Sequence, residues 1–424
     1  MEHDSIGALN VPAEAYYGVQ SMHAATNFQI THRLLHPVLI DSIVMVKKAA
    51  AITNEKSGKL DQQIAQAIIQ ACDEILDGNL RDQFIVDAIQ GGAGTSANMN
   101  ANEVIANRAI EILGGTKGDY SIVHPNDHVN MSQSTNDVIP TAGKITVLKL
   151  LPQTIKELEK LEKAMEEKEA EFDDILKMGR TQLQDAVPMR LGQSFGAFAH
   201  VLKRDIKRLK NVMDEMKVLN IGATAIGTAI NVDPYYLANI SYELSKVAGI
   251  SLKQADDLID ATQNLDGFVS VSGVLKTCAV DISKISNDLR LMSSGPRTGL
   301  SEINLPARQN ASSIMPGKIN SVIPEVVSQV AYLIIGHDYT ITMAAEAGQC
   351  EEYIEKSVGI STALCPYIGY AKSAEIAKKS LKTGISVKEL VLEEGLLKEE
   401  ELKEILKPEK MTQPMREKVM KAVS

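Results

Sequence analysis

Three long segments of this chain carry apolar residues at steps of three and four, the spacing that lines one face of an α-helix. In the first segment, Glu and Lys fill the other faces. Long amphipathic helices bury their stripes against one another, so three of them with short connections predict a helical bundle. The stripes are Leu151, Ile155, Leu158, Leu161, Met165 and Phe172; Phe198, Leu202, Ile206, Leu209, Met213, Met216 and Leu219; and Phe268, Val271, Leu275, Cys278, Ile282, Ile285, Leu289 and Met292.

The third segment is apolar on more than one side, because Val269, Val274, Ala279 and Val280 lie outside its stripe. A helix that is apolar on several faces is buried on several faces, either within its chain or between subunits. We therefore expect the chain to self-associate.

The composition also favours helices. The chain has 424 residues, no tryptophan and only 4% aromatic residues, and its length allows two or three domains. We predict a mainly α fold with a mostly helical N-terminal domain over residues 1–137, a central long-helix bundle over 138–350 and a small helical C-terminal domain over 351–424. Within the first of these, a helix is expected from about Pro37 to Glu55.

The net charge and the cysteine content indicate which partners and which compartment to expect. With 44 basic and 54 acidic residues the net charge is −10, which argues against nucleic acid and anionic membranes as partners. The four cysteines form no C-x-x-C pair, so free thiols in a reducing compartment are expected. No signal-peptide pattern and no apolar run of roughly 18 residues is present. The sequence predicts a cytoplasmic protein.

The segment Ser312–Asn320 is the most informative local feature. It places two hydroxyls, Lys318 and Asn320 within nine residues, with Pro316 and Gly317 between them. Such a set can hold a small dicarboxylate and place a serine oxygen beside an acidic C–H bond. Taken alone, the same segment is equally well interpreted as a polar loop before a helix.

A glycine-rich block, Gly91-Gly92-Ala93-Gly94-Thr95-Ser96, leads into a probable helix start. Free N–H groups and hydroxyls at a helix start make an anion site, with a cap expected near Thr95 or Ser96. The spacing fits neither a dinucleotide fold nor a P-loop. A capped helix with its turn is the alternative interpretation.

Ser134, Thr135 and Asn136 are three successive neutral hydrogen-bonding side chains just before a second expected helix. Such a cluster suits a carboxylate. His124 and His128 lie nearby, but no third ligand with suitable spacing accompanies them, so we expect no metal site.

Two further segments carry weak signals. Thr181 and Gln182 lie where one bundle helix is expected to end and the next to begin. The small-residue loop 222–228 allows close backbone approach.

Taken together, these segments resemble the aspartase/fumarase superfamily, and its aspartase branch more than its fumarase branch. The resemblance covers nearly the whole chain in order. It is carried by Tyr16-Tyr17-Gly18-Val19-Gln20, the block 91–103, Gln133-Ser134-Thr135-Asn136-Asp137, Gly179-Arg180-Thr181, and Ser312 through Asn320 with Pro324-Glu325.

The resemblance implies a role for each matching residue. Ser312 maps to the catalytic base, and Lys318 and Asn320, with Ser313 in the same loop, map to substrate binding. Thr181 and Gln182 join Ser312 in the catalytic set. The other carboxylate and the amino group of the substrate are assigned to Thr95, Ser134, Thr135, Asn136 and Thr181.

The resemblance also implies a fold and a reaction. Three mostly helical domains are expected, with four subunits packing their long helices together and three subunits contributing to each site. The expected activity converts L-aspartate to fumarate and ammonia, through an intermediate whose extra negative charge lies on the side-chain carboxylate. No organic cofactor is expected.

Four features depart from the family pattern. Gln182 stands where histidine is usual, Ala311 replaces glycine, and Ser321 replaces proline. Near residue 350, several tens of residues, equivalent to one bundle segment, are absent. Two alternatives stay open. A fumarate hydratase is one, since His124-Pro125-Asn126-Asp127 also resembles the fumarase branch. A catalytically impaired relative with a structural or partner-binding role is the other, because of these departures.

Overall fold

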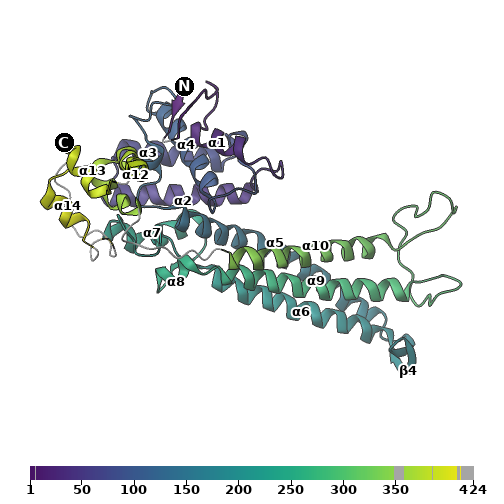
Figure 1. Cartoon of the computed structure of the whole chain (residues 1–424). Helices are drawn as coiled ribbons and strands as arrows, with labels where there is room; N and C mark the ends of the chain where they lie inside the picture. The colour runs from purple at the N-terminus through teal and green to yellow at the C-terminus, as the bar shows by residue number, and fades with distance from the viewer. Residues whose placement is uncertain (5, 348–357, 384, 408–410, 412–424) are drawn as a thin grey trace. The chain divides into compact units, whose positions relative to one another are not determined.

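The computed structural model of the chain describes residues 1–4, 6–347, 358–383, 385–407 and 411. Over these residues it is mainly helical, with three two-stranded sheets (Figure 1). The predicted mainly α fold class is thereby confirmed. The predicted shortening near residue 350 lies outside the described residues.

Two compact units make up the chain. Unit 1 comprises residues 1–146, 217–264 and 348–424, and unit 2 comprises 147–216 and 265–347. The division into three domains at residues 137 and 350 stays a prediction.

Unit 1 is built around α2 (Pro37–Lys56), which packs against α3 (Gln62–Leu76), α4 (Thr95–Ile112) and α7 (Pro234–Ala248). Its core is mainly aliphatic, with Phe84 and Tyr236 also fully buried. The smaller elements are the antiparallel pair β1 (Glu2–His3) and β2 (Ala8–Leu9), α1 (Val19–Asn27), the 3₁₀ turn η1 (Arg81–Gln83), the π-helix η2 (Pro125–Val129), α8 (Leu258–Gln263), and the parallel pair β5 (Val218–Leu219) and β6 (Lys253–Gln254).

The helix boundaries of unit 1 follow from local sequence. Pro37 occupies the first turn of α2, and the His36 ring accepts a hydrogen bond from the Val38 N–H. Asp61 and Asp233 cap α3 and α7 in the same way. The helix expected over Pro37–Glu55 is therefore confirmed to within one residue.

The C-terminal part of unit 1 forms its own small core. Its elements are η3 (Val358–Leu364), α11 (Cys365–Ile368), α12 (Tyr370–Thr383), α13 (Val387–Glu393) and α14 (Glu399–Ile405). The fully or nearly fully buried side chains of this core are Leu364, Ile376, Val387, Leu390, Val391 and Leu402.

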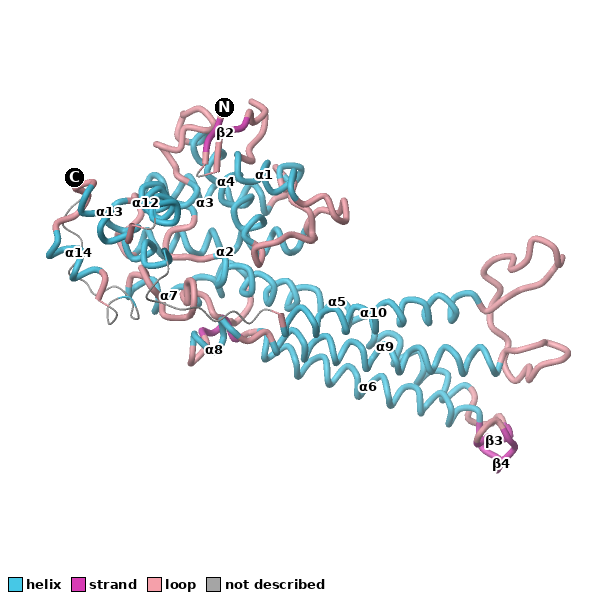
Figure 2. Tube along the Cα trace, in the orientation of Figure 1, coloured by secondary structure: helices cyan, strands magenta, loops and turns pink. Residues whose placement is uncertain are grey.

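Unit 2 contains the long helices. α5 (Thr135–Glu171) starts in unit 1 and belongs to unit 2 from Val147 onward. α9 (Asp266–Met292) packs against both α6 (Leu191–Met216) and α10 (Val322–Glu346), and Figure 2 shows these helices side by side. The stripe residues Phe198, Leu202, Ile206 and Leu209 are at most 6% exposed, so the predicted helical bundle is confirmed.

The connection between α5 and α6 contains a β-hairpin that the sequence analysis missed. Strands β3 (Leu176–Thr181) and β4 (Gln184–Arg190) pair in antiparallel fashion. One long helix ends and the next begins here, as expected, but a hairpin lies between them.

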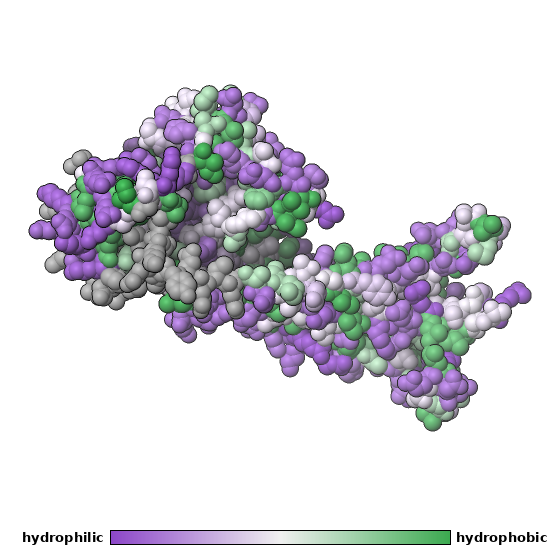
Figure 3. Space-filling model, in the orientation of Figure 1, coloured by the Kyte–Doolittle hydropathy of each residue, from purple (hydrophilic) through white to green (hydrophobic). Residues whose placement is uncertain are grey.

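Several large apolar side chains of the unit 2 helices are exposed. On α10, Val330, Leu333 and Tyr339 are 50%, 59% and 71% exposed, and Val280 of α9 is 50% exposed. Figure 3 shows hydrophobic side chains among polar ones on the visible surface of these helices. None of the helices in the described part of the chain combines the length and apolarity that a membrane crossing requires.

A buried carboxylate joins α1 to α4. Glu103 is 1% exposed and accepts hydrogen bonds from the N–H groups of Gly18, Gln20 and Ser21 at 2.8, 2.9 and 3.0 Å. Because no side chain of α1 caps its own N-terminus, Glu103 satisfies these donors from another helix.

We predict that Glu103→Ala lowers the free energy of unfolding by about 3 kcal/mol, because it leaves several buried N–H groups without a partner. The urea midpoint measures the effect. Glu111→Ala is the matched control on the same helix, since Glu111 is partly exposed, pairs with Arg108 and accepts from the Tyr16 hydroxyl but caps no backbone N–H of α1. It should cost about 1 kcal/mol or less. Equal losses for the two variants would contradict the capping role.

Candidate functional site

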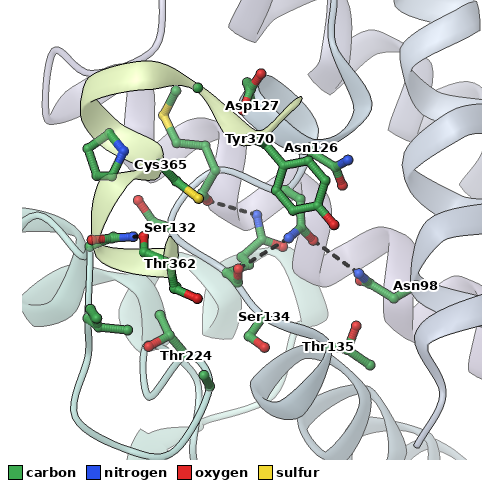
Figure 4. A pocket seen from close by; sticks show the side chains of 18 of the residues that line it. Asn98, Asn126, Asp127, Ser132, Ser134, Thr135, Thr224, Thr362, Cys365 and Tyr370 are labelled. Carbon is green, nitrogen blue, oxygen red and sulfur yellow. Dashed lines mark hydrogen bonds between the residues drawn. The ribbon is translucent and has the colours of Figure 1, made fainter. Parts of the chain in front are cut away.

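A cavity of about 880 Å³ opens within unit 1. Three of the predicted site residues, Thr95, Ser134 and Thr135, line it. Figure 4 shows Ser134, Thr135 and Thr224 on one side of it, with Cys365 and Tyr370 across from them. Other polar side chains in its wall belong to Lys59, Asn98, Asn126, Asp127, Asn130, Ser132, Gln133, Asn231, Asp233 and Thr362.

Ser134 immediately precedes α5, which begins at Thr135. Its hydroxyl oxygen accepts a hydrogen bond from the Asn136 N–H at 3.3 Å. Since that bond uses only a lone pair, the hydroxyl proton is available for an acceptor in the cavity. A hydroxyl donor at a helix N-terminus is suited to a carboxylate.

Thr95 is the first residue of α4, and its hydroxyl donates to the Gly92 carbonyl at 2.7 Å. The cap position is Gly94, which has φ +89° and offers no side chain. The cap expected at Thr95 or Ser96 is therefore wrong, because a left-handed turn favours glycine. With its proton engaged, the Thr95 oxygen is an acceptor, which suits an ammonium group.

Asn136 does not line the cavity. Its amide nitrogen donates to the Ala225 carbonyl at 2.7 Å, and the Asn220 side chain donates to the Asn136 carbonyl at 3.0 Å. These bonds fasten the start of α5 to the small-residue loop 222–228.

Thr181 and Gln182 belong to unit 2 and lie at the tip of the β3–β4 hairpin. The two turn residues, Gln182 and Leu183, have φ +51° and +63°. Two-residue hairpin turns with this geometry favour Asn and Gly, so both residues carry a conformational cost. Both are exposed in the single chain.

The segment between α9 and α10 carries the remaining predicted residues, Ser312, Ser313, Lys318 and Asn320. It is tied to the hairpin by Glu302, which pairs with Lys177 at 2.9 Å and with Arg180. Hydrogen bonding from Arg180 lowers the pKa of Glu302, and this effect is larger than the opposite effect of burial.

Ser312 has a hydroxyl oxygen that accepts two backbone hydrogen bonds, from Met315 N–H at 2.9 Å and Ile314 N–H at 3.3 Å. Donors aimed at this oxygen favour its deprotonated form. The loop folds back through a hydrogen bond from Ala311 N–H to the Lys318 carbonyl at 3.2 Å.

The family departures at Ala311 and Ser321 fit this local structure. Ala311 is not among the residues with positive φ, so its Cβ causes no backbone strain. The Ser321 hydroxyl lies 3.1 Å from that of Ser293, within hydrogen-bond distance.

The two histidines near the cavity have structural partners. His124 Nδ1 accepts from the N–H groups of Asn126 and Asp127, and His128 Nδ1 accepts from the His124 N–H. Across the described residues, no group of three or more His, Cys, Asp or Glu side chains could hold a metal ion. Cys72, Cys278 and Cys365 are free thiols.

Several residues that shape the cavity were missed by the sequence analysis. Lys47 and Asp137 are fully buried behind it, and Asn98 and Thr224 are buried in its wall. Lys47 carried a signal, because it falls at helical spacing between the buried Val44 and Ala51 on α2. Asp137 ends the motif that contains Ser134, Thr135 and Asn136, but only those three side chains were interpreted as ligand-binding groups.

Comparison with known proteins identifies the family. Residues 7–336 match the family model described as Lyase, and residues 360–413 match the one described as Fumarase C C-terminus. The chain belongs to the aspartase/fumarase family of lyases. The first match alone covers more than half of the sequence.

Several relatives are named aspartate ammonia-lyase. The chain is 49% identical to aspartate ammonia-lyase of a Bacillus species, with 98% of this chain and 97% of the relative covered, and 45% identical to that of Escherichia coli, with 98% and 96% covered. Among solved structures, a Brucella melitensis protein named fumarate lyase:delta crystallin, bound to cobalt, matches with a TM-score of 0.81 at 46% identity over 97% of this chain and 99% of that one.

The same comparisons bear on chain length. The alignment with the Bacillus relative spans 456 positions, 32 more than the 424 residues of this chain. At least 32 aligned positions therefore lack a residue in this chain, and they lie between its matched ends. This agrees with the sequence expectation of an absent segment.

The hairpin turn gives a prediction. Leu183→Gly should change the free energy of unfolding by about 1 kcal/mol or less, because relief of the left-handed conformation offsets the added chain entropy. Activity should nevertheless fall at least about tenfold, since a freer turn holds Thr181 and Gln182 less well. Thermal unfolding and steady-state turnover measure the two effects. Unchanged activity would show that the strained turn has no role in the reaction.

Proposed function

We propose that this protein is an ammonia-lyase that converts L-aspartate to fumarate and ammonia. The similarity to aspartate ammonia-lyases over nearly the full length, at 45–49% identity, carries the proposal. The hydrogen bonds of three hydroxyls support it from the structure. The Ser312 oxygen faces N–H donors, the Ser134 hydroxyl retains its proton, and the Thr95 oxygen is an acceptor.

In the proposed reaction, the Ser312 oxygen, in the deprotonated form that its N–H donors favour, takes the proton from C3 of aspartate. The electron pair of that C–H bond moves onto the adjacent carboxylate, which gains negative charge. Hydroxyl donors from Ser134 and Thr135 stabilise this charge more than they stabilise the ground state. The pair then forms the C2–C3 double bond as the C2–N bond breaks, and neutral ammonia leaves with the electrons of that bond.

The remaining predicted residues bind and orient the substrate. Lys318, Asn320 and Ser313 are assigned to the carboxylate next to the amino group, and Thr181 is assigned with the residues that hold the other carboxylate and the amino group. The oxygens of Thr95 and Gln182 are assigned as acceptors for the ammonium group. The resemblance also assigns Asn136 there, but its side chain bonds to the Ala225 carbonyl and does not line the cavity. Gln182 keeps a hydrogen-bonding role there but cannot relay a proton as histidine does.

We propose that the active particle is a homotetramer. The predicted site residues divide between two units of the chain, and the exposed apolar residues of α10 and α9 need a covering surface. A second copy of the same bundle offers the matching apolar face. We also expect the protein to act in the cytoplasm.

Fumarate hydration is the second candidate. A class II fumarase from Schistosoma mansoni matches the structure with a TM-score of 0.79 over 97% of this chain and 98% of that one, but at only 32% identity. The higher identity to aspartate ammonia-lyases favours deamination. The fit of Ala311 and Ser321 to the loop argues against a catalytically impaired relative.

A direct assay tests the proposed reaction. The purified protein should release fumarate from L-aspartate, followed by its ultraviolet absorbance, and should not release it from malate. Ser312→Ala should lower turnover by about a hundredfold or more, because the base is lost. Thr298→Ala removes another hydroxyl of the same segment and should keep parent activity. Turnover of malate alone would overturn the proposal, and an active Ser312→Ala would show that another group is the base.

Light scattering tests the assembly. Four copies of the 46.0 kDa chain give about 184 kDa. Leu333→Glu on α10 should shift the mass towards smaller species, because it buries a charge in the proposed interface. Tyr242→Glu alters a side chain of α7 with the same 59% exposure and should leave the mass unchanged. A monomeric parent protein that remains active would contradict the tetramer.

A further inference from the structure

A lysine lies fully buried directly behind the cavity wall. Lys47 of α2 is 0% exposed, and its ammonium donates to Asn130 Oδ1 at 2.7 Å and to Gln133 Oε1 at 3.0 Å. Both acceptors line the cavity. The adjacent residue, Lys48, instead pairs with Asp73 near the surface at 2.5 Å.

These contacts fix the segment that leads to Ser134. Gln133 donates onward to the carbonyls of Val129 and Met131 at 3.0 and 3.1 Å. Asn130 Oδ1 also accepts from Asn98 of α4 at 3.1 Å, a bond drawn in Figure 4. Lys47 is therefore the anchor of a network that holds the backbone from Val129 to Gln133.

Asp137 holds the other end of the same segment. It is 0% exposed, and its Oδ1 accepts from the Ser134 N–H at 2.9 Å. Its Oδ2 accepts from the N–H groups of Gly222 and Thr224, both at 3.1 Å. One carboxylate thus joins the residue before α5 to the loop on the same side of the cavity.

The two charges act on each other. Burial lowers the pKa of Lys47 to about 7, and the charge of Asp137 opposes that shift. Burial raises the pKa of Asp137 to about 6, opposed by its backbone hydrogen bonds and by Lys47. Cys72 of α3 also acts on Lys47, and Tyr236 of α7 faces Asp137.

We propose that Lys47 and Asp137 form a buried positioning pair that sets the hydroxyls of Ser134 and Thr135 for a dicarboxylate substrate. Neither side chain lines the cavity, so each acts through the segment between them. Burying two charges that do not touch is a poor way to gain stability, because desolvation offsets their attraction. Two charges placed on either side of one short loop instead specify its conformation.

The inference rests on the proposed function and is tested by steady-state kinetics with aspartate. Lys47→Met and Asp137→Asn should each lower kcat/KM by about tenfold or more, mostly through a raised KM, because the carboxylate is already bound in the ground state. The double variant should lose less than the two single losses combined, since it leaves no unpaired buried charge. The matched control Lys48→Met should keep the parent KM.

The pH profile separates positioning from a merely structural role. Lys47 loses its charge as pH rises through about 7, so the KM of the parent protein should rise over that range. Lys47→Met should abolish this part of the profile. Parent KM values in both single variants, or a lowered unfolding temperature without any change in KM, would overturn the inference.

Two further measurements keep the outcome decisive. If Lys47→Met fails to assemble, Gln133→Met removes one acceptor of Lys47, and an unchanged KM in that variant overturns the inference. If the parent protein does not turn over aspartate, the proposed function fails on its own. Calorimetric binding of succinate, an unreactive dicarboxylate, then decides: equal affinity in parent and Lys47→Met proteins would refute the pair, and weaker binding in the variant would support it.

Discussion

The carboxylate of Asp137 is the interaction on which the cavity wall depends. Three backbone N–H groups from two separate loops converge on it, and it has no exposure to water. Without this acceptor, those buried donors would lack partners, and the loops would have no common attachment. The carboxylate accepts from the backbone N–H of Ser134 and not from its hydroxyl. The hydroxyl therefore keeps its proton for a ligand.

Much of the fold was predictable, because helix periodicity reports burial directly. The stripe containing Phe198 and Leu202 and the helix beginning at Pro37 both came from local patterns, and both are present. The β3–β4 hairpin was not predictable in this way. Its turn residues, Gln182 and Leu183, are poor formers of a left-handed turn, so strand pairing overrides local preference there.

The residues of the candidate site were likewise predictable only in part. The hydroxyls of Ser134 and Thr95 were predicted as ligand-binding groups from their motifs, and both residues line the cavity. Lys47 was missed because its role is to contact those motifs from behind, and a charged residue inside an apolar run has no local explanation. Only the folded chain brings it to Asn130, which lies 83 residues further along the sequence.

The departures from the family pattern can be weighed by their physical cost. Ala311 would be harmful only in a left-handed conformation, which it does not adopt. Ser321 would be harmful only as an unsatisfied hydroxyl, and it has Ser293 within reach. With these two costs absent, the Ser312 hydroxyl retains both of its N–H donors. These donors would stabilise a deprotonated Ser312 oxygen, so the local structure of the loop agrees with the proposed role of Ser312 as the base.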